Sequence, residues 1–373
     1  MDDGWFGKRD DSTSSLGDWY PNEEKLKGTL KELAEKINAK GLKFGLWIEP
    51  EMTNKDSDLY RAHPDWLLAE QGKRICHSRT QYVLDFSKKE VREYIGDMLE
   101  NLLAEVPVSY IKWDMNRTFS EVFSNGNDRE YQGKVCHKYI LGVYELYERL
   151  TSRFPHVLFE SCASGGARFD PGMLYFAPQT WTSDDTDAAE REKIQYGTSF
   201  VYPIVSMGSH VSAVPNHQLH RTTPLSTRAN VAYFGTFGYE LDLNLLSAKE
   251  IEEVKAQVEF MKEHRDLIQV EGDFYRILSP FEGNDTAWMV VSRDKKQAVA
   301  GYYERLNKVN ASWMRLRFKG LDEDQLYKVK WEDKCLKAYG NELMYAGIPV
   351  DRDYCNKTNG DFHSVLYTIE AEG

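Results

Sequence analysis

Short apolar segments alternate with amphipathic segments between residues 23 and 265, and this alternation constrains the fold more than any other feature of the chain. In the amphipathic segments, apolar residues recur at spacings of three and four, as Leu26, Leu30 and Leu33 do, which predicts helices. Helices are expected over residues 23–40, 130–153, 188–200 and 225–234, and two more are expected to begin at capping boxes of Ser87 with Glu90 and of Ser247 with Glu250. Strands are expected over residues 43–48, 82–86, 110–113, 156–162, 178–182, 203–207 and 239–243. Such an alternation predicts a parallel α/β sheet, and the number of units favours a closed (β/α)8 TIM-type barrel over an open sheet.

The start of the chain does not supply a complete barrel. About six of these strands count as barrel strands, where a complete barrel has eight. Met1 is followed at once by the acidic and aromatic turn Asp2-Asp3-Gly4-Trp5-Phe6, with no apolar strand ahead of it. We therefore expect a barrel that lacks its first strand–helix unit.

The sequence changes character after about Glu271. Short β-branched and aromatic runs, separated by Asp, Gly and Asn turns, predict antiparallel strands over residues 274–278, 286–292, 297–303, 312–318, 326–331 and 364–369. The expected domains are a (β/α) barrel over residues 1–270 and a C-terminal antiparallel β-sandwich domain over residues 271–373.

The net charge and the cysteines of the chain limit the classes of binding partner and the cellular compartment that we expect. The net charge of −12 argues against nucleic acid or an anionic membrane surface as a partner. No apolar run approaches the ~20 residues that span a bilayer, and the polar, acidic residues 1–20 do not resemble a signal peptide. The five cysteines are odd in number, scattered and outside CxxC pairs, which favours reduced thiols and a cytoplasmic location.

A candidate catalytic carboxylate, Asp114, ends the strand that begins at Tyr110. Residues two apart in a strand point to the same face, so Lys112 and Asp114 share a face, and the charge of Lys112 favours an ionised Asp114. The carboxyl ends of barrel strands carry the catalytic groups in this type of fold. An Asp in this position could also do no more than cap the following loop.

Asp114 is one of three acidic turns, the others being Asp2-Asp3 and Asp184-Asp185-Thr186-Asp187. In retaining glycoside hydrolysis, one carboxylate attacks the anomeric carbon and a second, about 5–5.5 Å away, protonates the leaving oxygen. In phosphoryl transfer, clustered aspartates bind Mg²⁺, and the turn at 184–187 taken alone could serve that purpose. Both interpretations remain open from the residues alone.

Two further candidates have simpler explanations. His217 and His220 are three apart and could touch one metal ion, but no acid or cysteine cluster accompanies them, so ordinary loop histidines are expected. Cys162 would need a histidine base to act as a nucleophile, and a small pocket-lining thiol is the simpler interpretation.

Five ordered motifs carry a resemblance to a known family. They are Asp2-Asp3-Gly4-Trp5-Phe6, Gly45-Leu46-Trp47-Ile48-Glu49-Pro50-Glu51, Lys112-Trp113-Asp114-Met115-Asn116-Arg117, Ser161-Cys162-Ala163-Ser164-Gly165-Gly166 and Trp181-Thr182-Ser183-Asp184-Asp185-Thr186-Asp187. Together they resemble the bacterial α-galactosidases of glycoside hydrolase family 36, over essentially the whole chain. The resemblance implies a (β/α)8 catalytic barrel with a C-terminal antiparallel β domain, and retaining hydrolysis of terminal α-linked galactose in melibiose or raffinose-type oligosaccharides without a cofactor or metal.

The resemblance also assigns roles to matching positions. Asp114 would be the nucleophile, and Asp184 would be the general acid that later acts as base. Asp185 and Asp187 supply like charge that would favour a protonated Asp184. The substrate-binding residues would be Asp2 and Asp3 on the galactose hydroxyls, Trp47 as an apolar wall, and Arg79, Lys112, Asn116 and Cys162 along the pocket.

The chain departs from this family at its start. Family members of this type carry an N-terminal β-sandwich domain and the first strand and helix of the barrel ahead of the segment that matches here. The expectation is a fragment in which Asp2 and Asp3 extend from a chain terminus instead of a rigid strand end. A sugar-binding or inactive fragment, and a relative acting on α-N-acetylgalactosaminides, therefore stay open beside an α-galactosidase, as does a homo-oligomer.

Overall fold

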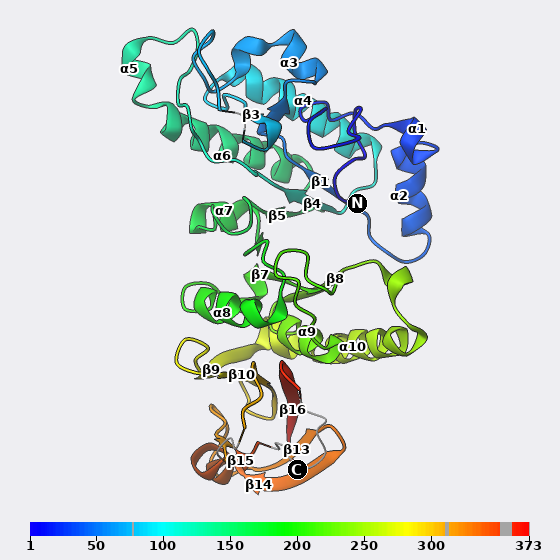
Figure 1. Ribbon diagram of the computed structural model, residues 1–373, viewed down its shortest axis with the longest axis vertical. Helices are drawn as coiled ribbons and strands as arrows, with labels where there is room; N and C mark the ends of the chain where they lie inside the picture. Colours follow the sequence, from blue (N-terminus) through cyan, green and yellow to red (C-terminus); the bar gives the residue numbers. More distant parts are fainter. Residues whose placement is uncertain (77, 310–312, 351–359, 373) are drawn as a thin grey trace. The chain divides into compact units, whose positions relative to one another are not determined.

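The computed structural model describes residues 1–76, 78–309, 313–350 and 360–372 (Figure 1). The chain divides into two compact units, Met1–Trp181 and Thr182–Gly373.

The first unit is built on parallel strands. The strands lie side by side in the order β1 (Gly45–Ile48), β4 (Tyr110–Trp113), β5 (Leu158–Ser161) and β6 (Gln179–Trp181). Each pair is parallel. Their carboxyl ends therefore meet at one edge of the sheet.

Two long helices, α4 (Lys89–Glu105) and α6 (Val135–Arg153), pack against each other beside this sheet (Figure 1). Trp113 of β4 stacks on Tyr147 of α6, with ring centroids 4.2 Å apart. Because side chains alternate along a strand, the residues on either side of Trp113, Lys112 and Asp114, point to the opposite face. The short helices α5 (Arg129–Gln132) and α7 (Pro171–Phe176) complete the helices of this unit after β4.

The single helix expected over residues 23–40 is wrong. The structure contains α1 (Glu23–Leu26) and α2 (Leu30–Asn38). Lys27 adopts a left-handed conformation (φ 53°) and Gly28 follows at φ 148°, which breaks the helix between them. Thr29 then starts α2 with a capping box to Glu32, so the apolar spacing continues across a break that spacing alone does not reveal.

The segment between β1 and α4 forms a separate small ribbon. Strand β2 (Met52–Asn54) pairs antiparallel with β3 (Gln81–Val83), so the strand expected over 82–86 belongs to this ribbon and not to the parallel sheet. Helix α3 (Asp58–Ala62) and the single turns η1 (Pro64–Trp66) and η2 (Ser78–Thr80) lie between the two strands.

The capping box expected at Ser87 is also wrong. The residue that caps α4 is Lys88, which makes no side-chain cap hydrogen bond. The Ser87 hydroxyl instead donates to Asp85 Oδ1 at 2.5 Å, because this carboxylate two residues earlier competes for it.

The second unit begins with alternating helices and strands. They are α8 (Ala188–Thr198), η3 (Ile204–Ser206), β7 (Met207–Ser212), α9 (Leu225–Ala232), β8 (Thr236–Glu240), η4 (Leu243–Leu245), α10 (Ala248–Asp266) and η5 (Leu267–Glu271). Strands β7 and β8 are parallel. The strand expected over 203–207 shares only Met207 with β7, because residues 204–206 form a helical turn, and the strand expected over 239–243 shares only Tyr239 and Glu240 with β8. The capping box of Ser247 with Glu250 is confirmed.

The rest of the second unit is an antiparallel sheet with the strand order β14-β13-β16-β11-β10-β9. Its strands are β9 (Gly272–Leu278), β10 (Asp285–Ser292), β11 (Gln297–Glu304), β13 (Leu326–Trp331), β14 (Lys334–Tyr339) and β16 (His363–Ala371). A two-stranded pair of β12 (Arg315–Leu316) and β15 (Ile348–Pro349) and the turn η6 (Glu342–Ala346) accompany it. Ser312, the first residue of one expected strand, lies outside the described residues, and so does Cys355.

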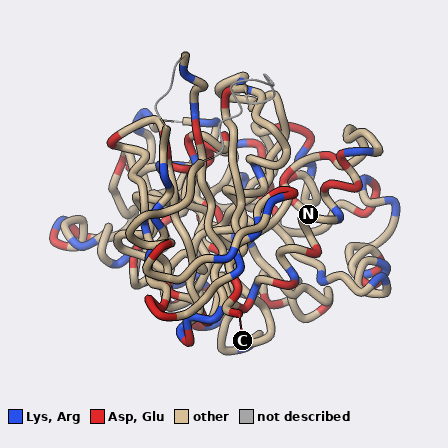
Figure 2. Tube along the Cα trace, turned by 90° about the horizontal axis from the view of Figure 1, so that it is seen from below, with Lys and Arg blue, Asp and Glu red and all other residues tan. Residues whose placement is uncertain are grey.

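Acidic and basic residues are interspersed along the whole trace (Figure 2). Many of them form exposed ion pairs within one helix, such as Lys255 with Glu252 and Lys262 with Glu259 in α10. Across the described ranges, no helix combines the length and the apolar character that a bilayer crossing requires.

Candidate active site

Asp114 lies directly after β4 and is 6% exposed. The Trp47 indole Nε1–H donates to its Oδ2 at 3.1 Å, and the Asn116 side-chain amide donates to the same oxygen at 2.8 Å. The Met115 backbone N–H donates to Oδ1 at 2.8 Å. Three N–H donors thus fix the orientation of both carboxylate oxygens at the carboxyl edge of the sheet.

The first residues of the chain are anchored beside β1. The Trp47 N–H donates to the Met1 carbonyl at 3.0 Å, and the Trp5 indole N–H donates to the Trp47 carbonyl at 3.0 Å. Asp3 forms an ion pair with the buried Arg9, with 2.9 Å between Asp3 Oδ1 and Arg9 Nε. The Asp2 carboxylate accepts the Asp3 N–H. Asp2 and Asp3 lie outside any strand at the chain terminus, as expected, but the backbone hydrogen bond to β1 and the buried Trp5 hold the segment around them in place. Both carboxylates are exposed.

Lys112 lies between an acid and an aromatic ring. Its Nζ is 3.9 Å from Glu160 Oε1 and 5.2 Å from the centroid of the Trp181 ring. Glu160 is buried and accepts hydrogen bonds from Tyr110 and from the Gln179 amide, which hold it in the face that Lys112 shares. The ammonium is half-buried, and a substrate hydroxyl beside it would meet a hydrogen-bond donor.

Cys162 follows β5 and is buried. Burial, followed by the charge of Asp114, raises the pKa of its thiol far above the ordinary value. A protonated thiol is a poor nucleophile, which agrees with the interpretation of Cys162 as a pocket-lining residue near Asp114.

Arg79 and Asn116 belong to different segments and act on the carboxylates at this edge in different ways. Arg79 is exposed in η2 and has a left-handed backbone (φ 55°). Its charge acts on Glu49, the residue that follows β1. Asn116 contacts Asp114 through its amide, while its side-chain oxygen accepts the Ser164 hydroxyl at 3.2 Å.

Glu49 is a site residue that the sequence did not predict. It directly follows β1, just as Asp114 directly follows β4. The register pairs Ile48 with Trp113, so the next residues on the two strands are Glu49 and Asp114. An acid at the end of a buried strand was the signal that selected Asp114, and the same signal was present in Ile48-Glu49-Pro50.

Asp184 belongs to the second unit and is half-buried in the turn before α8. Its neighbours in the turn have structural uses. Asp187 caps α8 by accepting the N–H groups of Ala189 and Glu190, and it pairs with Arg221. Asp185 accepts the Asp187 N–H at 3.1 Å.

Two acidic residues of the turn at 184–187, Asp185 and Asp187, make structural contacts. Within the described parts of the chain, no group of three or more His, Cys, Asp or Glu side chains is arranged to hold a metal ion. Asp187, which a Mg²⁺ site at 184–187 would need, is already engaged by the α8 N-terminus and Arg221.

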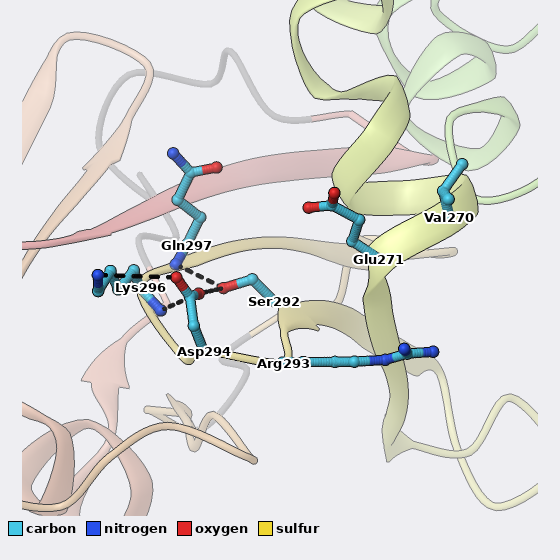
Figure 3. A pocket seen from close by; sticks show the side chains of 7 residues that line it. All are labelled: Val270, Glu271, Ser292, Arg293, Asp294, Lys296 and Gln297. Carbon is cyan, nitrogen blue, oxygen red and sulfur yellow. Dashed lines mark hydrogen bonds and ion pairs between the residues drawn. The ribbon is translucent and has the colours of Figure 1, made fainter.

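A pocket in the second unit contains none of the predicted site residues. Its volume is about 630 Å³, and its lining residues are Val270, Glu271, Ser292, Arg293, Asp294, Lys296 and Gln297 (Figure 3). Asp294 accepts hydrogen bonds from the Ser292 hydroxyl and the Lys296 N–H across the β10–β11 turn. These contacts show that Ser292 and Asp294 stabilise the turn.

The model of the melibiase family matches residues 1–271, and the model of the glycosyl hydrolase family 36 C-terminal domain matches residues 285–369. The chain belongs to the melibiase family. The resemblance predicted from the five ordered motifs is thereby confirmed.

Individual members of the melibiase family are similar over the whole chain. The α-galactosidase AgaA of Geobacillus stearothermophilus is 51% identical over 372 residues, which are 100% of this chain and 50% of AgaA. The bifunctional α-galactosidase/sucrose kinase AgaSK of Mediterraneibacter gnavus is 48% identical, over 94% of this chain and 36% of AgaSK. This chain therefore spans about half or less of the length of these relatives.

Solved structures of the melibiase family agree with the fold. The crystal structure of AgaA, a family 36 enzyme, matches with a TM-score of 0.95 at 50% identity, over all of this chain and 50% of that one. Variants of AgaA have been solved with raffinose and with stachyose. The match confirms the predicted combination of a barrel-type parallel α/β part with a C-terminal antiparallel β part.

Proposed function

We propose that this chain is a retaining α-galactosidase that cleaves terminal α-linked galactose from oligosaccharides such as melibiose and raffinose. The observation that carries the proposal is Asp114, a buried carboxylate held by three N–H donors at the carboxyl end of a parallel strand in a member of the melibiase family. The relatives named α-galactosidase and the AgaA complexes with raffinose and stachyose support the choice of substrate.

In the proposed first step, Asp114 attacks the anomeric carbon of galactose and the bond to the leaving oxygen breaks. Asp184 gives its proton to that oxygen, so the aglycone leaves as an alcohol and a galactosyl ester of Asp114 remains. The donors on Asp114 keep one of its oxygens aimed at the sugar, which reduces the entropy lost on reaching the transition state.

In the second step, Asp184 takes a proton from water, the water oxygen attacks the anomeric carbon, and the ester bond to Asp114 breaks. Two displacements at one carbon retain its configuration. Sugar hydroxyls would be bound by the charged side chains of Lys112, Arg79, Asp2 and Asp3. The nucleophile would be held by Asn116 and Trp47. Cys162 would line the pocket.

The test is hydrolysis of 4-nitrophenyl α-galactoside by the chain as written and by Asp114→Asn. The substitution keeps the size of the side chain but replaces one carboxylate oxygen with an NH2 group, which removes the nucleophile and one hydrogen-bond acceptor, so we expect a loss of kcat of at least about 10³-fold. The thermal unfolding temperature of the variant serves as the folding control.

The control substrate is 4-nitrophenyl α-N-acetylgalactosaminide. Faster turnover of this compound would replace galactose by N-acetylgalactosamine in the proposal. An Asp114→Asn protein that keeps wild-type activity would overturn the proposal altogether.

Two further expectations remain predictions. A homo-oligomer would show as a mass of two or more chains in light scattering, and the cytoplasmic location predicted from the cysteines would be tested by cell fractionation.

A further inference from the structure

We propose that Glu49 is a positioning residue for Asp114, and that it acts through Asn116 at the carboxyl edge of the first unit's sheet. The inference rests on the proposed function, because it concerns how the nucleophile of that reaction is held. It is carried by the strand register, by a chain of hydrogen bonds and by burial.

The strand register brings the two carboxyl groups together. Strands β1 and β4 are parallel neighbours, and Ile48 pairs with Trp113. The Asp114 N–H then donates to the Ile48 carbonyl at 2.8 Å, which continues the ladder to the next pair of residues. Neighbouring strands lie about 4.8 Å apart, so Glu49 and Asp114 emerge side by side on one face.

Hydrogen bonds connect Glu49 to the nucleophile through one residue. The Asn116 backbone N–H donates to Glu49 Oε1 at 2.5 Å, and the Asn116 side-chain amide donates to Asp114 Oδ2 at 2.8 Å. The Gln81 amide donates to the other oxygen of Glu49 at 3.0 Å and fixes the carboxyl from the opposite side. Glu49 therefore sets the position of the Asn116 backbone, and this backbone sets the position of the amide that holds Asp114.

The charge state of Glu49 decides whether this arrangement helps or opposes Asp114. Glu49 is 1% exposed, and two buried carboxylates side by side cannot both ionise at low cost. Burial, followed by the charge of Asp114, raises the pKa of Glu49 to about 8, against smaller effects of the Asn116 hydrogen bonds and the charge of Arg79. The charged groups facing Glu49 are thus Asp114 from the end of β4 and Arg79 from η2.

Below about pH 8, Glu49 is a neutral hydrogen-bond partner, and Asp114 carries the negative charge of the pair. Above this pH, an ionised Glu49 repels Asp114 and disturbs the alignment through Asn116. The structure thus links an alkaline loss of activity to a residue that has no need to touch the sugar.

The experiment compares Glu49→Gln and Glu49→Ala with the wild-type chain, with 4-nitrophenyl α-galactoside between pH 5 and 9.5. This leaving group needs little protonation, so kcat/KM depends weakly on the general acid. Wild-type kcat/KM should fall about tenfold between pH 7 and pH 9, in keeping with a group of pKa about 8. Glu49→Gln keeps an oxygen for the Asn116 N–H and cannot ionise, so it should stay within about threefold of wild type at pH 6 and lose the alkaline decline.

Glu49→Ala should lower kcat about 10- to 100-fold at pH 6 with KM changed less than about twofold, because a misplaced nucleophile slows the chemical step more than binding. Glu192→Gln is the matched control: Glu192 is a buried acid of the second unit, and its replacement should leave the pH profile of kcat/KM unchanged.

The outcomes separate this inference from the proposed function. An alkaline decline that persists in Glu49→Gln, or a kcat of Glu49→Ala equal to wild type, would overturn the role of Glu49 while leaving the α-galactosidase proposal intact. A wild-type chain without galactosidase activity would overturn both.

Discussion

At the scale of single residues, Asp114 determines the chemistry of its surroundings. Its charge contributes to the raised pKa of Glu49 and of the Cys162 thiol, after burial in both cases. Its hydrogen bonds come from Trp47, Asn116 and the Met115 backbone. Burying a carboxylate in this environment costs folding free energy, and such a cost is typical of a functional site.

Trp47→Phe tests the indole hydrogen bond. The substitution keeps an aromatic wall but removes the N–H donor to Asp114 Oδ2. A hydrogen bond to a charged group contributes about 1.5–3 kcal/mol, so kcat should fall roughly 10- to 100-fold. Steady-state kinetics with 4-nitrophenyl α-galactoside measures this change.

Trp113→Phe is the control for that substitution. Trp113 also donates its indole N–H to a carboxylate, Glu51, but on the opposite face of the sheet. This variant should unfold at a lower temperature and keep its kcat. Equal kcat losses in the two variants would argue against a specific role of Trp47.

The sequence allowed Asp114 to be selected, because an acid at the end of an apolar strand is visible in one segment. The role of Glu49 depends on which strands are neighbours and in what register, and neither can be read from spacing. The same limit explains why Lys112 could be placed on the face of Asp114 while its contacts with Glu160 and Trp181 could not be foreseen.

At the scale of helices and strands, local signals were reliable where competing groups were absent. The capping box of Ser247 with Glu250 was predicted and is present. Ser87 has the same spacing to Glu90, but Asp85 takes its hydroxyl. Strand β13 was predicted with its observed ends, whereas β14 was missed because its alternation of Lys, Leu and Ala is weak.

Thr29→Ala tests the break between α1 and α2. The Thr29 hydroxyl accepts the Glu32 N–H, and the Glu32 carboxylate accepts the Thr29 N–H. Loss of such a cap costs about 1 kcal/mol of unfolding free energy. Urea unfolding followed by circular dichroism measures the loss, and Thr29→Ser should restore most of it. An unchanged stability of Thr29→Ala would show that α2 does not depend on its cap.

At the scale of the whole molecule, each compact unit contains its own buried ion pair. In the first unit, Arg168 forms two hydrogen bonds to Glu51, at 2.8 and 2.9 Å, and Glu51 also accepts from Trp113 and Tyr139. In the second unit, Glu192 accepts from Thr286 at 2.6 Å and from Arg305 at 3.3 Å. These acids join segments far apart in sequence.

Glu51→Gln should destabilise the first unit strongly. The Arg168 side chain, which is 14% exposed, would lose its counter-charge, and breaking a largely buried ion pair costs up to about 3–5 kcal/mol. Glu252→Gln, which removes one acid of an exposed pair in α10, is the control and should leave the unfolding midpoint unchanged. A Glu51→Gln protein as stable as the control would contradict this assignment.

Glu192 makes stability depend on pH. Burial raises the pKa of Glu192 to about 7, above its usual value of 4.5. Between these values the folded chain binds more protons than the unfolded chain, so the free energy of unfolding falls as the pH rises from about 4.5 to about 7. The unfolding temperature measured at pH 5, 6, 7 and 8 should decrease, and Glu192→Gln should flatten the decrease. A parallel decrease in both proteins would assign it to other groups.

The cysteines have a practical consequence for labelling. Cys76, Cys136 and Cys335 are exposed thiols, whereas Cys162 is buried beside Asp114 and resists losing its proton. Maleimides and iodoacetamides react with the thiolate, so these reagents should attach to the exposed cysteines first. A fluorophore or a solid support could then be coupled to the chain with Cys162 still unmodified.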